Sequence, residues 1–195
     1  MFSVNVDKLM KMTPLEAESY AKAADTIEGM LTDSENILSV TGNGLSSFKL
    51  AAAFMEKGRK VLFIDADINQ EVFVGKYKLG KNLKGILDFL RGETEINDLI
   101  CVTNRANLDV VFTGSTEGME HFSIQESDLR TALEFYADKY DIVVVQSDDE
   151  GRVASVCDQT VLIIEKDNYS ELSAEMRVKE LDKKGCFVLG VIIDE

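Results

Sequence analysis

The chain has 195 residues, of which 35 are acidic and 21 are basic, so its formal net charge is −14. This length suffices for one α/β domain, and the acidic charge argues against binding to nucleic acid or to an anionic membrane surface, since both depend on clustered lysine and arginine. No apolar run approaches the roughly 18 residues of a membrane span, so we expect a cytoplasmic protein without membrane insertion.

The cysteines, the histidine and the basic residues give no pattern typical of a metal or nucleic-acid site. Cys101, Cys157 and Cys186 are far apart, which fits buried thiols in a reducing cytoplasm. His121 has no cysteine or second histidine beside it, so we interpret it as structural. The stretch from Lys76 to Lys84 holds four lysines, which we interpret as a solvated loop, with docking of an acidic partner as the alternative.

Short apolar, β-branched runs alternate with amphipathic stretches, which predicts an α/β fold with a mostly parallel sheet flanked by helices. We expect one domain over residues 1–195. In chain order, the pattern predicts a helix at 14–31, a strand at 36–41, a helix at 46–57, a strand at 60–65, a helix at 83–91, a strand at 108–113, a helix at 125–139, strands at 141–146 and 160–165, a helix at 169–184 and a strand at 187–193. The helix start signals are Thr13 before Pro14, Ser46, Ser47 and Ser127, and the stop signals are Gly58 and Gly185.

The segment "GNGLSS", residues 42–47, has the outline of a P-loop, of the deviant Walker A type. A P-loop surrounds phosphates with backbone N–H groups, while a lysine neutralises the phosphate oxygens and a hydroxyl ligates Mg²⁺. Leu45 stands where the lysine is needed. A hydrogen bond to a charged group is worth about 1.5–3 kcal/mol, so its loss should weaken nucleotide binding by roughly one to two powers of ten. The candidate nucleotide-binding residues are Gly42, Asn43, Gly44, Leu45, Ser46 and Ser47.

Asp65 and Asp67 end a predicted strand, where ligands of open α/β sheets bind. Alternate residues of a strand share a face, so both could reach a magnesium ion together with Ser46. An acidic strand end without a ligand is the alternative, and the nearby glycine turn favours a phosphate site. Lys49 begins about 6 Å further along the helix axis, so we do not expect it to replace the missing lysine.

The order of these elements resembles the bacterial tyrosine kinases (BY-kinases), a family within the wider P-loop class of MinD and ParA. The family's members are cytoplasmic ATP-dependent autokinases that regulate capsule and exopolysaccharide export. The similarity covers nearly the whole chain. It is carried by "ESYAKAADTI" (18–27), "VLFIDADI" (the family's Walker A′ motif), "NLKGILDFLRGETEINDLI" with "NLDVVFTGS" (its G-L-S-D-x-L-x-G-E segment and following strand), "YDIVVVQSDD" (its Y-D-x-V-I-I-D-T-P-P strand), "CDQTVLIIEKDNYS" and "VLGVIID".

Two departures from the family's pattern bear on catalysis. Gln146 stands where the resemblance places the Walker B aspartate, so a neutral amide replaces a carboxylate that helps to hold magnesium. Asp148 and Asp149 follow, and would compensate only if the loop were rebuilt. We also expect the tyrosine-rich tail that such kinases phosphorylate to be missing.

A third departure concerns self-association. The resemblance implies an E-x-x-R-x-x-R helix that contributes to a ring of identical subunits. Glu18 matches its glutamate, but Ala21 and Ala24 stand where its arginines belong. A ring is therefore not expected, and the sequence does not indicate another oligomeric state.

Three hypotheses follow. The leading one is a catalytically impaired BY-kinase-like regulator or scaffold of capsular or exopolysaccharide biosynthesis and export. It would dock on the cytoplasmic side of a membrane chain-length regulator or on an active kinase, and would bind ATP or ADP with Mg²⁺ poorly or not at all. The alternatives are a slow autokinase or ATPase that still binds Mg·ATP, and a degenerate ParA/MinD-like positioning protein.

Overall fold

The computed structural model describes residues 3–32, 34–67, 72–73, 84–117, 125–148 and 150–194. His121, Asp149 and the basic stretch before Lys84 lie outside the described residues, so the interpretations given for them stay predictions.

In the described part of the chain, eight strands form one sheet in the order β1-β4-β5-β3-β6-β2-β7-β8. Neighbouring strands are parallel except β4 and β5, which are antiparallel. The six expected strands are confirmed, while β1 and β4 were missed because two or three residues are too few to show a period. The strands are β1 Ser3–Val4, β2 Ile37–Thr41, β3 Val61–Asp65, β4 Cys101–Thr103, β5 Leu108–Val111, β6 Ile142–Ser147, β7 Gln159–Glu165 and β8 Val188–Asp194.

The five expected helices are also confirmed, with two corrections to their starts. α2 begins at Gly44 with Asn43 as its N-cap, so Ser46 and Ser47 lie in its first turn rather than before it. Gln125 precedes α4, and Ser127 lies inside that helix. The helices are α1 Pro14–Glu28, α2 Gly44–Glu56, α3 Ile86–Leu90, α4 Glu126–Ala137 and α5 Glu171–Lys183, with short 3-10 turns at Ile96–Leu99, Ala154–Val156 and Lys166–Asn168.

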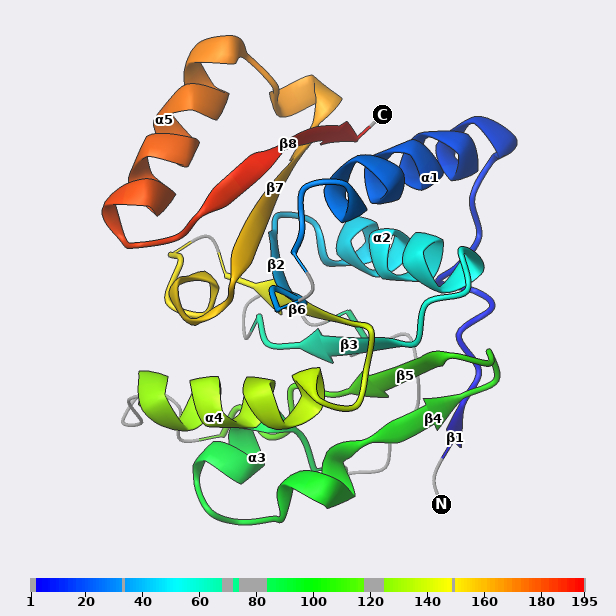
Figure 1. The fold of residues 1–195 in the computed structure, drawn as a ribbon, viewed down its shortest axis with the longest axis vertical. Helices are drawn as coiled ribbons and strands as arrows, with labels where there is room; N and C mark the ends of the chain where they lie inside the picture. Colours follow the sequence, from blue (N-terminus) through cyan, green and yellow to red (C-terminus); the bar gives the residue numbers. More distant parts are fainter. Residues whose placement is uncertain are drawn as a thin grey trace.

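The helices form a layer on each side of the sheet (Figure 1). α1 and α2 cover one face, where Phe48 of α2 meets Phe63 of β3 edge to face, with 5.1 Å between ring centroids. α3 and α4 cover the other face, and α5 covers that face beside β7 and β8. Because the central strands are covered on both faces, β2, β3 and β6 are buried along their whole length.

The parallel arrangement brings the carboxyl ends of β2, β3, β6 and β7 to one edge of the sheet. β2 lies between β6 and β7, while the chain that leaves β2 passes through α2 to β3 on the far side of β6. Open α/β sheets bind their ligands where neighbouring connections diverge in this way. The fold therefore places residues 42–47 at the expected position for a ligand site.

Asp88 fixes the short helix α3 to the chain that follows β5. Its fully buried carboxylate accepts hydrogen bonds from the backbone N–H groups of Gly85 (2.8 Å) and Ser115 (3.2 Å). Arg91 Nη2 and Lys84 Nζ lie 3.0 and 3.3 Å from its other oxygen. Burial alone would raise the pKa of Asp88, but these donors outweigh it and lower the pKa below its ordinary value.

We predict that Asp88→Asn lowers the free energy of unfolding by about 2–3 kcal/mol at neutral pH, because it leaves two cations beside a neutral amide. A depressed carboxyl pKa stabilises the fold above the unfolded pKa, and that stabilisation is lost as the pH falls through the folded pKa. The deficit of the variant, measured by urea denaturation, should therefore shrink in acid.

Glu93→Gln is the matched control. Glu93 pairs with the same Lys84 and Arg91, but its side chain is 46% exposed. An exposed pair contributes about 0–1 kcal/mol, so this variant should change stability little. An Asp88→Asn deficit that is equally large in acid would contradict the assignment.

Candidate functional site

The turn after β2 is tight because Gly42 lies directly against β7. Its φ of +131° is in the region that favours glycine, and a Cβ at this position would lie 2.3 Å from the carbonyl oxygen of Ile163. The carbonyl of Gly42 accepts a hydrogen bond from Gln146 Nε2 at 2.9 Å. The turn is thus held by β6 and β7 on either side of β2.

Asn43 occupies the backbone donors at the start of α2. Its Oδ1 accepts from the N–H groups of Leu45 (2.9 Å) and Ser46 (3.4 Å), and its Nδ2 donates to Glu165 Oε1 at 3.1 Å. In a P-loop such N–H groups point at phosphate oxygens, and four residues separate the two glycines of the motif. Here one residue, Asn43, separates Gly42 from Gly44, and its side chain takes the place of an anion.

The two serines of the motif are also bonded within the chain. Ser47 Oγ donates to the carbonyl of Asn43 at 3.0 Å. Ser46, which is 3% exposed, donates from Oγ to Asp194 Oδ2 at the end of β8. The hydroxyl that would ligate magnesium therefore contacts a carboxylate of the protein itself.

Tyr20 of α1 also bonds to Asp194. Its hydroxyl donates to Asp194 Oδ1 at 3.0 Å, so one carboxylate joins α1, α2 and β8. Burial raises the pKa of the Tyr20 phenol well above its ordinary value, and the Asp194 charge raises it further. Tyr20 thus stays protonated as a donor. We call Tyr20, Ser46 and Asp194 the Asp194 latch.

The side chain of Lys49, a residue of α2, contacts α1 and not the glycine turn. Its Nζ is 2.8 Å from Glu16 Oε1. The hydrogen bonds that Glu16 receives from Lys49 and from the backbone of Thr13 lower its pKa to about 2. As expected, Lys49 is committed elsewhere and does not take the place of the lysine that Leu45 replaces.

The carboxylates expected to bind magnesium lie at the same sheet edge. Asp65 and Asp67 are 1% and 3% exposed, and Asp65 Oδ2 accepts from the backbone N–H of Val72 at 2.7 Å. Gln146 is level with Asp65 in the neighbouring strand, so these two positions lie side by side. Within the described residues, no group of three or more acidic, cysteine or histidine side chains has the geometry to hold a metal ion.

Gln146 does not supply the charge that a Walker B carboxylate would give, and Asp148 lies two residues further along the chain. Gln146 is fully buried, and its Oε1 meets no hydrogen-bond donor among the described residues. Asp148 lies beyond the end of β6, where its Oδ2 is 3.6 Å from Arg152 Nε. The described residues of this edge thus retain the carboxylates of Asp65 and Asp67, while the positions of Leu45 and Gln146 carry no charge.

The sequence analysis missed Tyr20 and Asp194 as site residues. The rule that singled out Asp65 applies equally to Asp194, since both end parallel strands of one sheet and such ends meet at one edge. Tyr20 carries no comparable local signal, because its spacing marks only a buried helix face.

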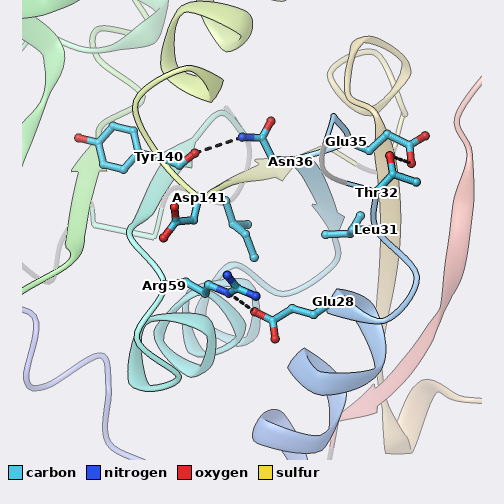
Figure 2. Close-up of a pocket in the computed structure, with 9 residues that line it drawn as sticks. Glu28, Leu31, Thr32, Glu35, Asn36, Arg59, Tyr140 and Asp141 are labelled. Carbon is cyan, nitrogen blue, oxygen red and sulfur yellow. Dashed lines mark hydrogen bonds and ion pairs between the residues drawn. The ribbon is translucent and has the colours of Figure 1, made fainter.

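A separate polar pocket of about 360 Å³ lies at the opposite edge of the sheet, where β2 and β6 begin (Figure 2). Its polar groups bond to one another: Arg59 Nε lies 2.8 Å from Glu28 Oε1, and Asn36 Nδ2 donates to the carbonyl of Tyr140 at 3.1 Å. These pairs stabilise the pocket's walls and leave the edge with residues 42–47 as the better candidate site.

In the described part of the chain, no helix has the length and apolarity to cross a membrane.

Comparison with known proteins gives a consistent set of similarities. The family model described as "AAA domain" matches residues 41–150, more than half of the chain. The tyrosine-protein kinase CpsD of Streptococcus agalactiae is 26% identical over 192 residues, covering 92% of this chain and 84% of that protein. The tyrosine-protein kinase etk of Escherichia coli K12 is 25% identical over 177 residues, a match that covers 85% of this chain but 24% of etk.

Solved structures show the same fold. The kinase domain of the Escherichia coli tyrosine kinase ETK aligns with a TM-score of 0.77 at 22% identity, covering 99% of this chain and 88% of that domain. The septum site-determining protein MinD of Pyrococcus horikoshii, solved with Mg-ADP, aligns with a TM-score of 0.60 at 20% identity, covering 82% of this chain and 70% of MinD.

The close approach at Gly42 gives a stability prediction. Gly42→Ala should lower the free energy of unfolding by about 3 kcal/mol or more, because the new Cβ meets backbone and cannot move away. Gly58→Ala is the control, since Gly58 has a φ of +88° but nothing lies within 4 Å of the added Cβ. It should lose only about 1 kcal/mol from backbone strain. Equal losses in urea denaturation would contradict the described packing of the turn.

Proposed function

The chain belongs to the AAA-domain family and, within it, to the bacterial tyrosine kinases, and on that premise we propose that it is a kinase-like protein that transfers no phosphoryl group. It acts as a regulator or scaffold in the biosynthesis and export of a capsular or extracellular polysaccharide. Its position is cytoplasmic, at the inner face of the membrane, where a partner recruits it.

The contact between Ser46 and Asp194 carries this proposal. A magnesium nucleotide would have to displace Asp194 from Ser46 and Asn43 from the α2 amides. Loss of a helix cap costs about 1 kcal/mol, and loss of a hydrogen bond to a charged group about 1.5–3 kcal/mol. The missing lysine contact costs about another 1.5–3 kcal/mol, so the total is roughly 4–7 kcal/mol, which corresponds to about three to five powers of ten in affinity.

The charge of the chain supports the proposed partner. A protein with a net charge of −14 is attracted to basic segments. Loops and tails next to membrane spans on the cytoplasmic side are rich in lysine and arginine. The cytoplasmic end of a membrane chain-length regulator, or an active kinase bound there, offers such a segment.

Residual nucleotide binding is the second candidate, because the buried carboxylates of Asp65 and Asp67 are retained. Isothermal titration with ATP and ADP, with and without Mg²⁺, separates the two. We expect no heat of binding at millimolar nucleotide for the wild type. We also expect none for Leu45→Lys alone, since the donors of the turn are still occupied. Magnesium-dependent binding by the wild type at micromolar nucleotide would contradict the proposal and favour a slow autokinase.

Genetic complementation tests the absence of phosphoryl transfer in the cell. A strain without this gene should show altered amount or chain length of its polysaccharide. Asp67→Asn, which removes a candidate magnesium ligand, should restore the wild-type polymer as fully as the native gene does. Failure of this folded, normally expressed variant would indicate that chemistry at the site is needed.

A strain without the gene whose polymer is unchanged but whose cell-pole structures are misplaced would favour the ParA/MinD-like positioning alternative.

A further inference from the structure

β8 forms one margin of the sheet and has the features of a pairing edge. In the described part of the chain its only neighbour is β7. Val191 and Ile193 are 36% and 44% exposed, and no charged residue lies between Lys184 and Asp194. Natural proteins protect edge strands with charges, proline or bulges, because a bare edge pairs with other strands. Here a register shift interrupts only the start of β8, so Gly190–Asp194 pairs regularly with β7 and leaves a regular outer edge.

An uncharged stripe on α1 lies next to this edge. Ser19, Ala23, Thr26 and Met30, which follows the end of α1, are spaced four, three and four residues apart, the spacing of a helix-packing seam. Thr26 Oγ1 already donates to the carbonyl of Lys22 at 2.9 Å, so its hydroxyl needs no partner on the stripe. Between the stripe and β8 lies an apolar groove of about 240 Å³, lined by Ala23, Thr26, Ile27, Met30, Val161 and residues 189–192.

We propose that this face binds a second copy of the chain around a two-fold axis. The two β8 strands pair antiparallel and continue the sheet from one copy into the other, while the α1 stripes face each other on one side of the joined sheet. A two-fold interface uses the same patch on both copies, so that patch must complement itself. A bare strand edge beside an uncharged helix stripe satisfies this condition.

The charges at the two ends of β8 indicate which partner pairs with this strand and in which relative direction. Lys183 and Lys184 precede the strand, while Asp194 ends it beside Glu165 of β7. In an antiparallel pair, the basic start of each strand lies next to the acidic end of the other. A parallel pair would bring like charges together, which is unfavourable. The complement to these ends is therefore another copy of the same strand.

The size of the patch predicts the strength of the dimer. Seven residues of β8 span about 23 Å, and the fifteen residues of α1 span about 22 Å, so the two features match in length. A helix is about 10 Å across and packed layers lie about 10 Å apart, so the patch is roughly 20 Å deep and buries about 450 Å² per copy. A total of about 900 Å² is below the roughly 1,200–2,000 Å² of stable interfaces and in the range of weak, transient ones, which predicts dissociation in the micromolar range.

Sedimentation velocity over a micromolar concentration series tests the proposal. The wild type should shift from 21.7 kDa towards twice that mass as the concentration rises. Ile193→Lys places a charge on the strand edge, and Met30→Lys places one on the α1 stripe. Each should weaken the dimer by at least about tenfold, as loss of an interface anchor does. Circular dichroism and thermal melting should show that both variants keep the fold.

Leu172→Lys is the control for an added charge, because Leu172 is an apolar residue of α5 that is 69% exposed and belongs neither to β8 nor to the α1 stripe. It should leave the dimer unchanged. Three outcomes would overturn the proposal: a wild type that stays at 21.7 kDa throughout, a dimer that survives both Ile193→Lys and Met30→Lys, or one that is lost only in Leu172→Lys. The test needs no nucleotide, so its failure would leave the proposed function standing.

Discussion

The arrangement of the candidate site depends on the two hydrogen bonds that the Asp194 carboxylate accepts. It accepts from Ser46 of α2 and from Tyr20 of α1, and thereby fixes the last strand and the first helix to the glycine turn. A partly buried carboxylate is stabilised by the donors that satisfy it, and both donors here lie on helices that pack on the same face of the sheet. The latch therefore couples the packing of three elements to the chemistry of one serine.

The fold is shared with the kinase domain of the Escherichia coli tyrosine kinase ETK. The sheet still brings Gly42, Asp65 and Gln146 to one edge, as the parallel topology requires. The groups that would face a phosphate, however, are neutral or are bonded within the chain. Asn43 caps the amides of Leu45 and Ser46, and Asp194 accepts a hydrogen bond from the Ser46 hydroxyl.

Most of the fold was predictable from the sequence because it depends on local patterns. Apolar runs located the six longer strands, and Gly58 and Gly185 correctly marked the ends of α2 and α5. The turn itself was found from its glycines. Its N-cap, Asn43, was missed because two serines further on offered equally good capping groups. The latch could not be read from any local pattern, since Ser46 and Asp194 are 148 residues apart and meet only through the order of strands in the sheet.

Hydrogen exchange at the amides of Leu45 and Ser46 is the most direct test of the claim that the chain itself occupies the phosphate turn. If Asn43 caps these amides, their protection should be the same with and without millimolar Mg·ADP. It should fall in Asn43→Ala, which removes the acceptor but keeps the backbone. Increased protection of both amides in the wild type on adding Mg·ADP would contradict the claim, because it would mean that phosphate oxygens displace the cap.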